Sequence, residues 1–190
     1  AGRIGSVFNA SELSNEVGVS SNTISSWVSV LQASYIIFLL PPYFDNNRKR
    51  LTKSPKIYFT DTGLACYLLG IESTDQLIRD KMRGSIFENF LITEALKFRF
   101  NRGKESNIFF YRDSHQNEVD LIIRKATGLS AVEIKSSMTF NTQFEKTLHH
   151  IDNWITNPII EKAIVYTGTY ENVKGEIKLL NFRNFNDLLV

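Results

Sequence analysis

Apolar and polar residues in the first 35 positions alternate with the period of helices. Residues 11–17 (SELSNEV) predict a short helix that begins at a serine cap, and residues 18–20 (GVS) predict a tight turn. A second helix is predicted to start at residues 21–23. Its apolar side chains recur at intervals of three, four and seven residues, and they are Ile24, Trp27, Val28 and Leu31.

Two helices joined by a short glycine-containing turn are typical of a helix-turn-helix. In that arrangement the first helix crosses the DNA duplex and the start of the second faces the major groove. The start of the second predicted helix carries small polar residues. The predicted DNA contacts at this position are Ser21, Asn22, Thr23 and Ser25.

Two apolar runs, residues 35–40 and 56–59, predict strands, and the segment between them is basic. A hairpin with a basic tip after a helix-turn-helix has the form of a wing. The side chains predicted to reach DNA from it are Arg48, Lys49, Arg50 and Lys53. Two alternatives stay open: the segment is a solvated hairpin tip, or the winged helix contacts protein instead of DNA.

Residues 61–69 predict a further helix, and the polar segment that follows lacks a regular pattern. This change of pattern indicates a boundary between two domains. We expect a winged helix-turn-helix domain over residues 1–70, a linker over 71–83 and a second domain over 84–190.

The second domain is predicted to mix helices and strands. A long helix over residues 84–100 places Phe87, Phe90, Leu91 and Phe98 on one stripe. The elements predicted after it are strands at 107–112, around Asp120 and around Glu133, a helix at 139–154, and strands at 159–167 and 177–182. The order helix, three strands, helix, strand predicts an α/β (α+β) fold with a mixed central sheet.

Two of these strands carry charged residues inside apolar runs. One reads Glu118-Val119-Asp120-Leu121, and the other reads Val132-Glu133-Ile134-Lys135. Side chains alternate across a strand, so Glu133 and Lys135 share one face while their apolar neighbours point to the other. Two adjacent strands of this kind would bring two carboxylates and an ammonium group together. The plainer alternative is a solvated sheet face with an ordinary surface ion pair.

The charged pattern is suited to binding a divalent metal and hydrolysing a phosphodiester. We expect Asp120 and Glu133 to hold Mg²⁺ or Mn²⁺, because these cations prefer carboxylate oxygens. Lys135 would orient a water molecule and offset developing negative charge. Glu88 on the long helix would bind a second metal or a metal-bound water. Glu94 is the alternative helix carboxylate, and Glu118 could substitute for Asp120 or assist it.

The order Glu88, Asp120 and Glu133-Ile134-Lys135 resembles the PD-(D/E)xK nuclease superfamily, which includes restriction endonucleases and Holliday-junction resolvases. The phrase Val132-Glu133-Ile134-Lys135-Ser136-Ser137 is close to the usual third-strand signature of that superfamily. Val119 stands before Asp120 where many members have proline, but the chemistry of the site depends on the carboxylate of Asp120 and not on the residue before it. The resemblance implies an αβββαβ nuclease-like domain, with Glu88, Asp120, Glu133 and Lys135 as its catalytic residues.

Nearly the whole chain is similar to the C-terminal part of a prokaryotic AAA+ ATPase family that ends in a nuclease-like domain of unknown function. The motifs that carry this likeness are Leu39 to Tyr43, Lys53 to Ala65, Gly84 to Asn89 and the two charged strands. The resemblance implies that an ATPase module normally precedes residue 1. The chain has no Gly-rich Lys-Ser/Thr phosphate loop, so ATP would be bound only through that module.

Composition and charge narrow the class of protein. Residues 1–60 hold six Lys/Arg against three Asp/Glu, whereas residues 61–190 hold sixteen against seventeen. Attraction to a polyanion therefore concentrates in the N-terminal third. The single cysteine excludes an internal disulfide, and the longest apolar run is too short to span a bilayer. We expect a cytoplasmic protein without membrane contact, present here as a piece of a longer chain. Self-association into a homo-oligomer is left open.

Three functions are compatible with these patterns. The favoured one is a DNA-binding, nuclease-like region of an ATPase that cuts DNA with Mg²⁺. The second is a module without catalytic activity that engages DNA or a partner protein for the ATPase. The third is a transcription regulator whose second domain senses a ligand.

Overall fold

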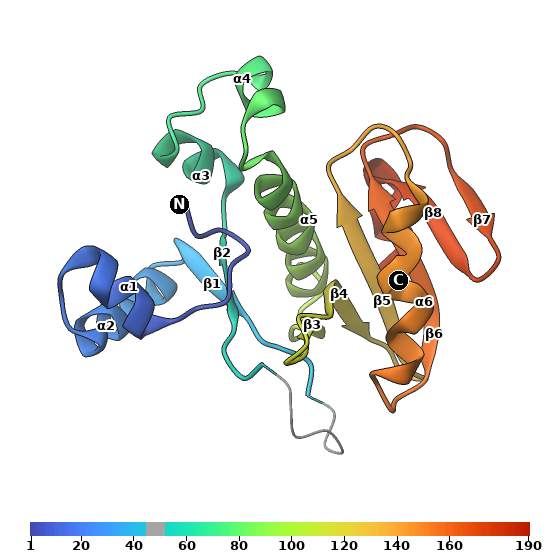
Figure 1. The fold of residues 1–190 in the computed structure, drawn as a ribbon, viewed down its shortest axis with the longest axis horizontal. Helices are drawn as coiled ribbons and strands as arrows, with labels where there is room; N and C mark the ends of the chain where they lie inside the picture. Colours follow the sequence, from blue (N-terminus) through green and yellow to red (C-terminus); the bar gives the residue numbers. More distant parts are fainter. Residues whose placement is uncertain (45–51) are drawn as a thin grey trace.

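The computed structural model describes residues 1–44 and 52–190. Two N-terminal helices and a small two-stranded sheet lie on one side of a long central helix, and a larger mixed sheet lies on its other side (Figure 1). The predicted combination of helices with a mixed sheet is confirmed. Within the described residues, no helix is long and apolar enough to cross a membrane.

The first two helices are α1 (Ala10–Val17) and α2 (Ser21–Ala33). The side chain of Asn9 caps α1, in place of the predicted serine cap within residues 11–17. Gly18 ends α1 with φ of 79°, a left-handed conformation that favours glycine. Of the predicted apolar face of α2, Ile24 and Val28 are buried, whereas Trp27 and Leu31 are substantially exposed.

Strands β1 (Ile37–Leu40) and β2 (Lys56–Phe59) pair antiparallel. They confirm the two strands predicted on either side of the basic segment. Arg48, Lys49 and Arg50 lie outside the described residues. The N-terminal segment runs along the free edge of β2, because the Gly5 nitrogen donates to the Ile57 carbonyl at 2.9 Å and the Ile57 nitrogen donates to the Ser6 carbonyl at 3.0 Å.

Two short helices, α3 (Thr62–Leu68) and α4 (Thr74–Arg79), lead into the central helix α5 (Arg83–Phe100). The segment predicted as a linker over 71–83 therefore contains a helix of its own. Of the stripe predicted on α5, Leu91 is buried and Phe87 and Phe98 pack against the core, whereas Phe90 is exposed and its ring packs against Phe182. The buried residues of α5 are Ile86, Asn89, Leu91, Ile92, Thr93 and Ala95.

The large sheet has six strands in the order β3-β4-β5-β6-β8-β7. Their bounds are β3 Ile108–Arg112, β4 Glu118–Arg124, β5 Leu129–Lys135, β6 Ile159–Tyr166, β7 Asn172–Lys174 and β8 Ile177–Asn181. The first three strands form an antiparallel meander, as expected, and β5, β6 and β8 are parallel. The edge strand β7 was not predicted from the sequence.

The predicted helix over 139–154 is broken into three short pieces. A 3₁₀ turn, η1 (Thr142–Glu145), precedes α6 (Lys146–His150), and a second one, η2 (Ile151–Asn153), follows it. The last predicted strand ends one residue early, because Phe182 begins a 3₁₀ segment, η3 (Phe182–Leu188). Helix α6 packs with a core on one face of the sheet, and α5 packs with the core on the other.

One hydrophobic core joins the N-terminal part to the rest of the chain. It contains side chains from α2, β2, α5 and the sheet, exemplified by Ile24, Ile57, Ile92 and Leu121. Hydrogen bonds reinforce the junction, because the buried Asn89 side chain accepts from the Phe59 nitrogen at 2.7 Å and donates to the Phe59 carbonyl at 2.8 Å. Residues on both sides of the predicted linker therefore contribute to the same hydrophobic core.

Candidate functional site

The candidate site lies where strands β4 and β5 part. The backbone register between them runs from Arg124 opposite Leu129 to Leu121 opposite Val132. Beyond Leu121 and Val132 the backbones of β4 and β5 are no longer paired in this register. There the side chain of Asp120 accepts a hydrogen bond from β5 instead, from the Ile134 nitrogen to Asp120 Oδ2 at 2.8 Å. The side chain of Asp120 is thereby fixed against the backbone of β5.

Asp120, Glu133 and Lys135 are in direct contact. The Nζ atom of Lys135 lies 2.6 Å from Glu133 Oε2 and 3.3 Å from Asp120 Oδ2. The alternation predicted for β5 places Glu133 and Lys135 on one face, and Val132 and Ile134 belong to the core beneath α5. The Glu133 side chain is only 5 % exposed, so it does not belong to a solvated sheet face.

Glu133 carries an unusual carboxyl group. Burial, followed by the nearby charge of Asp120, raises its pKa to about 8, and the Lys135 ammonium opposes this rise only in part. Its Oε1 atom is buried and accepts no hydrogen bond from any described residue. Buried acceptors are nearly always paired, so this oxygen marks a position suited to a proton or a cation.

The raised pKa of Glu133 predicts how the stability of the metal-free protein depends on pH. Between about 4.5 and about 8 the unfolded chain has released this proton while the folded chain still holds it, so the free energy of unfolding should fall as pH rises. Urea unfolding in EDTA across this window should show the fall, and Glu133→Gln should make it shallower. Some fall should remain, because the pKa of Glu88 is raised as well. Glu161→Gln is the control, because lysine contacts lower the pKa of Glu161. A flat wild-type profile would contradict the prediction.

A second group of charged residues adjoins the first. Lys56 on β2 lies with its Nζ 3.0 Å from Glu88 Oε1 and 2.5 Å from Glu118 Oε1. The Tyr58 hydroxyl also donates to Glu88 Oε1. Arg112 approaches the other oxygen of Glu118 at 3.2 Å. Glu88 thus lies with the other charged residues, as expected, but its carboxylate is paired with a lysine.

Asp120 connects the two groups electrostatically. Burial raises the pKa of Glu88, the Lys56 ammonium opposes that rise, and the Asp120 charge adds to it. The same Asp120 charge raises the pKa of Glu133. The neighbouring carboxylates also raise the pKa values of Lys56 and Lys135, against the effect of burial, so both lysines are charged at neutral pH.

Three residues of this cluster were not predicted from the sequence, and they are Lys56, Tyr58 and Arg112. Lys56 and Tyr58 alternate along β2 and therefore point to the same side, where both contact Glu88. The available signal was a lysine at the start of the apolar run Lys56 to Phe59, whose members are all buried. The alternative carboxylate Glu94 is not part of the cluster, because it is exposed and pairs with Lys97 at 3.0 Å.

The predicted DNA contacts lie elsewhere on the chain. Ser21, Asn22 and Ser25 are exposed at the start of α2, and Thr23 is partly buried and shares a hydrogen bond with the capping Ser20. Lys53 is exposed just before β2. The other three predicted wing cations lie in the segment that is not described.

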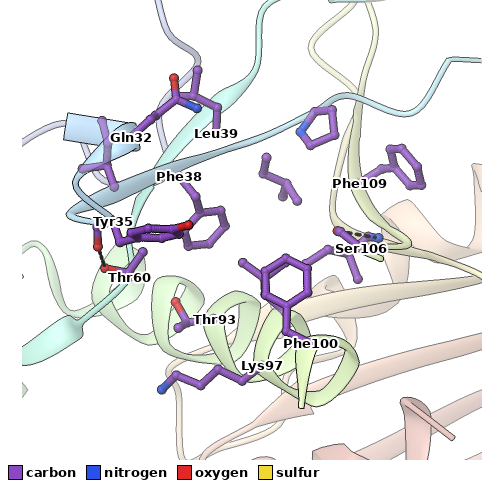
Figure 2. A pocket seen from close by; sticks show the side chains of 15 residues that line it. Gln32, Tyr35, Phe38, Leu39, Thr60, Thr93, Lys97, Phe100, Ser106 and Phe109 are labelled. Carbon is purple, nitrogen blue, oxygen red and sulfur yellow. Dashed lines mark hydrogen bonds between the residues drawn. The ribbon is translucent and has the colours of Figure 1, made fainter. Parts of the chain in front are cut away.

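A separate cavity of about 550 Å³ opens between β1, the second half of α5 and the start of β3. Figure 2 shows the rings of Phe38 and Phe100 directed toward its interior, whereas the Lys97 amine points away from it. That amine is paired with Glu94. None of the charged residues around Asp120 lines this cavity, so it is distinct from the candidate site.

The charged cluster offers few metal ligands. Across residues 1–44 and 52–190, no group of three or more His, Cys, Asp or Glu side chains is arranged to hold a metal ion. Asp120 and Glu133 provide carboxylate oxygens on either side of the exposed end of Lys135. A cation at this site would therefore have at most two protein carboxylates and would keep water molecules as its other ligands, as Mg²⁺ commonly does.

Comparisons with known proteins match two families of undefined role. Residues 83–185 match a domain of unknown function (DUF4143), and residues 1–75 match another domain of unknown function (DUF8612). Uncharacterized proteins of Mycobacterium bovis and Mycobacterium tuberculosis are each 29 % identical over 71 % of this chain, and one of Haemophilus influenzae is 26 % identical over 90 %. The chain spans 30 to 39 % of the length of these relatives. No solved structure matches the chain.

Proposed function

The chain belongs to the DUF4143 family through residues 83–185, and from that premise we propose that its charged cluster is a divalent-cation site that hydrolyses phosphodiester bonds in DNA. The observation that carries the proposal is the contact of Asp120, Glu133 and Lys135 at the fork between β4 and β5. Two carboxylates and a lysine in contact, with the buried Glu133 Oε1 left without a hydrogen bond from any described residue, are not required to stabilise a sheet.

The residues present fit Mg²⁺ or Mn²⁺. Both cations prefer oxygen ligands, and Asp120 and Glu133 supply carboxylates on adjacent strands. The unpaired Oε1 of Glu133 is a buried acceptor that a cation would satisfy. The Lys135 side chain is 31 % exposed, so its amine can withdraw from between the carboxylates when a cation enters.

With a cation bound, Asp120 and Lys135 would have different roles in the reaction. A bound cation would supply activation of water and charge neutralisation at the phosphate. Asp120, held by the Ile134 nitrogen, would keep its carboxylate in place. Lys135 would orient the attacking water and offset negative charge that develops on the phosphate oxygens.

The order of elements around the site supports the same proposal. Helix α5, the meander β3-β4-β5, the helical segment around α6 and the parallel strand β6 follow the αβββαβ order of the PD-(D/E)xK nuclease-like fold. We infer that residues 83–190 adopt that fold and that Val119 takes the place of its usual proline. A shared fold does not by itself give activity, so the residues of the site carry the argument.

DNA would be engaged by the N-terminal part. We propose that α1, α2, β1 and β2 form a winged helix whose exposed Ser21, Asn22 and Ser25 face the major groove. The basic segment that includes Arg48, Lys49 and Arg50 would contact phosphates. Because phosphate contacts release counterions, binding to DNA should weaken steeply as salt concentration rises.

We also propose that an ATPase module precedes this region in the whole protein. The relatives are much longer than the chain, and their additional length could accommodate such a module. A second function is favoured by one observation: Lys135 and Lys56 already pair with the site's carboxylates, so the cluster is balanced without a metal. On that alternative the region is a DNA- or partner-binding module of the ATPase.

Cleavage assays test the proposed function. The 190-residue chain should cut single-stranded, duplex or branched DNA in Mg²⁺ or Mn²⁺, and EDTA should stop the reaction. Asp120→Asn should abolish it, because the charge that holds the cation is removed while the size of the side chain is kept. Cutting that persists in this variant points to a contaminant. No cutting by folded wild-type protein would contradict catalysis and favour the binding module.

A further inference from the structure

Lys56 lies between the carboxylates of Glu88 and Glu118 and pairs with both. Its Nζ is 3.0 Å from Glu88 on α5 and 2.5 Å from Glu118 on β4. The strand that carries it, β2, belongs to the N-terminal part of the chain, which packs against α5 through the shared core. The ammonium therefore reaches the candidate site from outside the segment that matches the DUF4143 family.

Lys56 and Lys135, the two lysines of the cluster, differ in how far their side chains can move. The Lys56 side chain is 2 % exposed, and the Phe110 ring lies 5.4 Å from its amine. Its backbone pairs on one side with Leu40 and forms a bridge to Val7 on the other. Lys135, by contrast, is partly exposed at the end of its strand. An entering cation can displace Lys135 toward solvent, whereas Lys56 has no such path.

Glu88 is enclosed from several sides. The Tyr58 hydroxyl and the Lys56 amine both bind its Oε1. A Cβ atom added to Gly5 would lie 3.5 Å from its Oε2, so the N-terminal segment passes close to the second oxygen. Gly5 has φ of 73°, a conformation that favours glycine. The Glu88 carboxylate is therefore already paired within the protein, although its side chain is 16 % exposed.

We propose that the Lys56 ammonium occupies the position of a second cation between Glu88 and Glu118, so that the site holds one divalent metal, at Asp120 and Glu133. This inference rests on the proposed function and specifies it: the N-terminal part supplies a built-in cation where a two-metal site would bind its second ion. Lys56 is a positioning residue, because it acts on Glu88 and Glu118 and not on the reacting atoms. The expectation that Glu88 binds a metal is replaced by this role.

The stoichiometry of Mn²⁺ binding tests the inference without relying on cleavage. Calorimetric titration of the 190-residue chain with Mn²⁺ alone should give one site per chain, and Asp120→Asn should lose it. Lys56→Ala should gain a second, weaker site, because Glu88 and Glu118 are then left without their cation. Glu88→Gln should keep the single site and lower its affinity by less than about 100-fold, because Glu88 is not a ligand.

A matched control separates this effect from a general loss of packing. Lys162 on β6 is also buried, and its described ion-pair partners are Asp152 and Glu176 rather than Glu88 or Glu118. Lys162→Met should therefore leave Mn²⁺ binding at one site. Circular dichroism would establish that each variant is folded before titration.

The outcomes distinguish this inference from the proposed function. Wild-type protein that binds no Mn²⁺ would contradict both. One site in wild type together with one site in folded Lys56→Ala would overturn only the role of Lys56. A loss of Mn²⁺ affinity of more than about 100-fold in folded Glu88→Gln exceeds the usual cost of a residue that only supports the ligands. It would make Glu88 a ligand and would overturn the inference, even if Lys56→Ala does not fold.

Discussion

Lys135→Met is expected to lower the rate of DNA cleavage by about 10²- to 10³-fold at saturating Mg²⁺, the usual cost of losing one group that stabilises transition-state charge. Methionine keeps the length of the side chain but removes the ammonium that lies 2.6 Å from Glu133. The affinity for Mn²⁺ should rise, because the amine that competes for the two carboxylates is gone. If Lys135 only stabilised the fold, its replacement would not lower the cleavage rate and raise the Mn²⁺ affinity at the same time.

The measurement is kcat together with the dissociation constant for Mn²⁺. The matched control is Lys125→Met at the other end of β4, where Lys125 is partly buried and pairs with Glu161 at 3.2 Å. This variant should cleave and bind Mn²⁺ as wild type does. Cleavage by Lys135→Met at the wild-type rate would exclude the role given to its amine.

Lys56→Met is expected to lower the free energy of unfolding by about 3–5 kcal/mol, because removing one partner of a buried pair leaves the other charge uncompensated. Glu88 would keep the Tyr58 hydrogen bond but lose its only described cation. The double variant Lys56→Met/Glu88→Gln should recover at least about 1 kcal/mol of that loss, since the stranded charge is then removed as well.

Urea unfolding of the four proteins in this double-mutant cycle measures the coupling. Lys97→Met provides a comparison, because Lys97 forms an exposed pair with Glu94 and its loss should cost at most about 1 kcal/mol. Additive effects of the Lys56 and Glu88 substitutions would show that the two side chains are not energetically linked.

The sequence was informative where a local period determines the structure. Alternation along β5 placed Glu133 and Lys135 on one face, and their contact with Asp120 follows from the pairing of adjacent strands. The helix pair α1 and α2 was also predictable, because Gly18 and the spacing of Ile24 and Val28 are short-range signals. Each of these predictions depends on one short stretch of consecutive residues.

The parts that were missed depend on contacts between distant segments. Lys56 meets Glu88 only because β2 packs against α5, and no local pattern encodes that packing. The stripe predicted for α5 left out two buried polar residues, Asn89 and Thr93, which hydrogen-bond to Phe59 on β2. Periodicity counts such residues as solvent-facing, although their partners allow them to be buried.

The two hydrogen bonds between the Asn89 side chain and the Phe59 backbone also have a consequence for how the gene segments of this region are inherited. They cross the gap between the segments that match separate families, 1–75 and 83–185. Either segment, transferred alone to another gene, would carry one half of a buried contact and an unmatched apolar surface. Selection should therefore keep the two segments together, and recombination that preserves a working protein should move them as one piece.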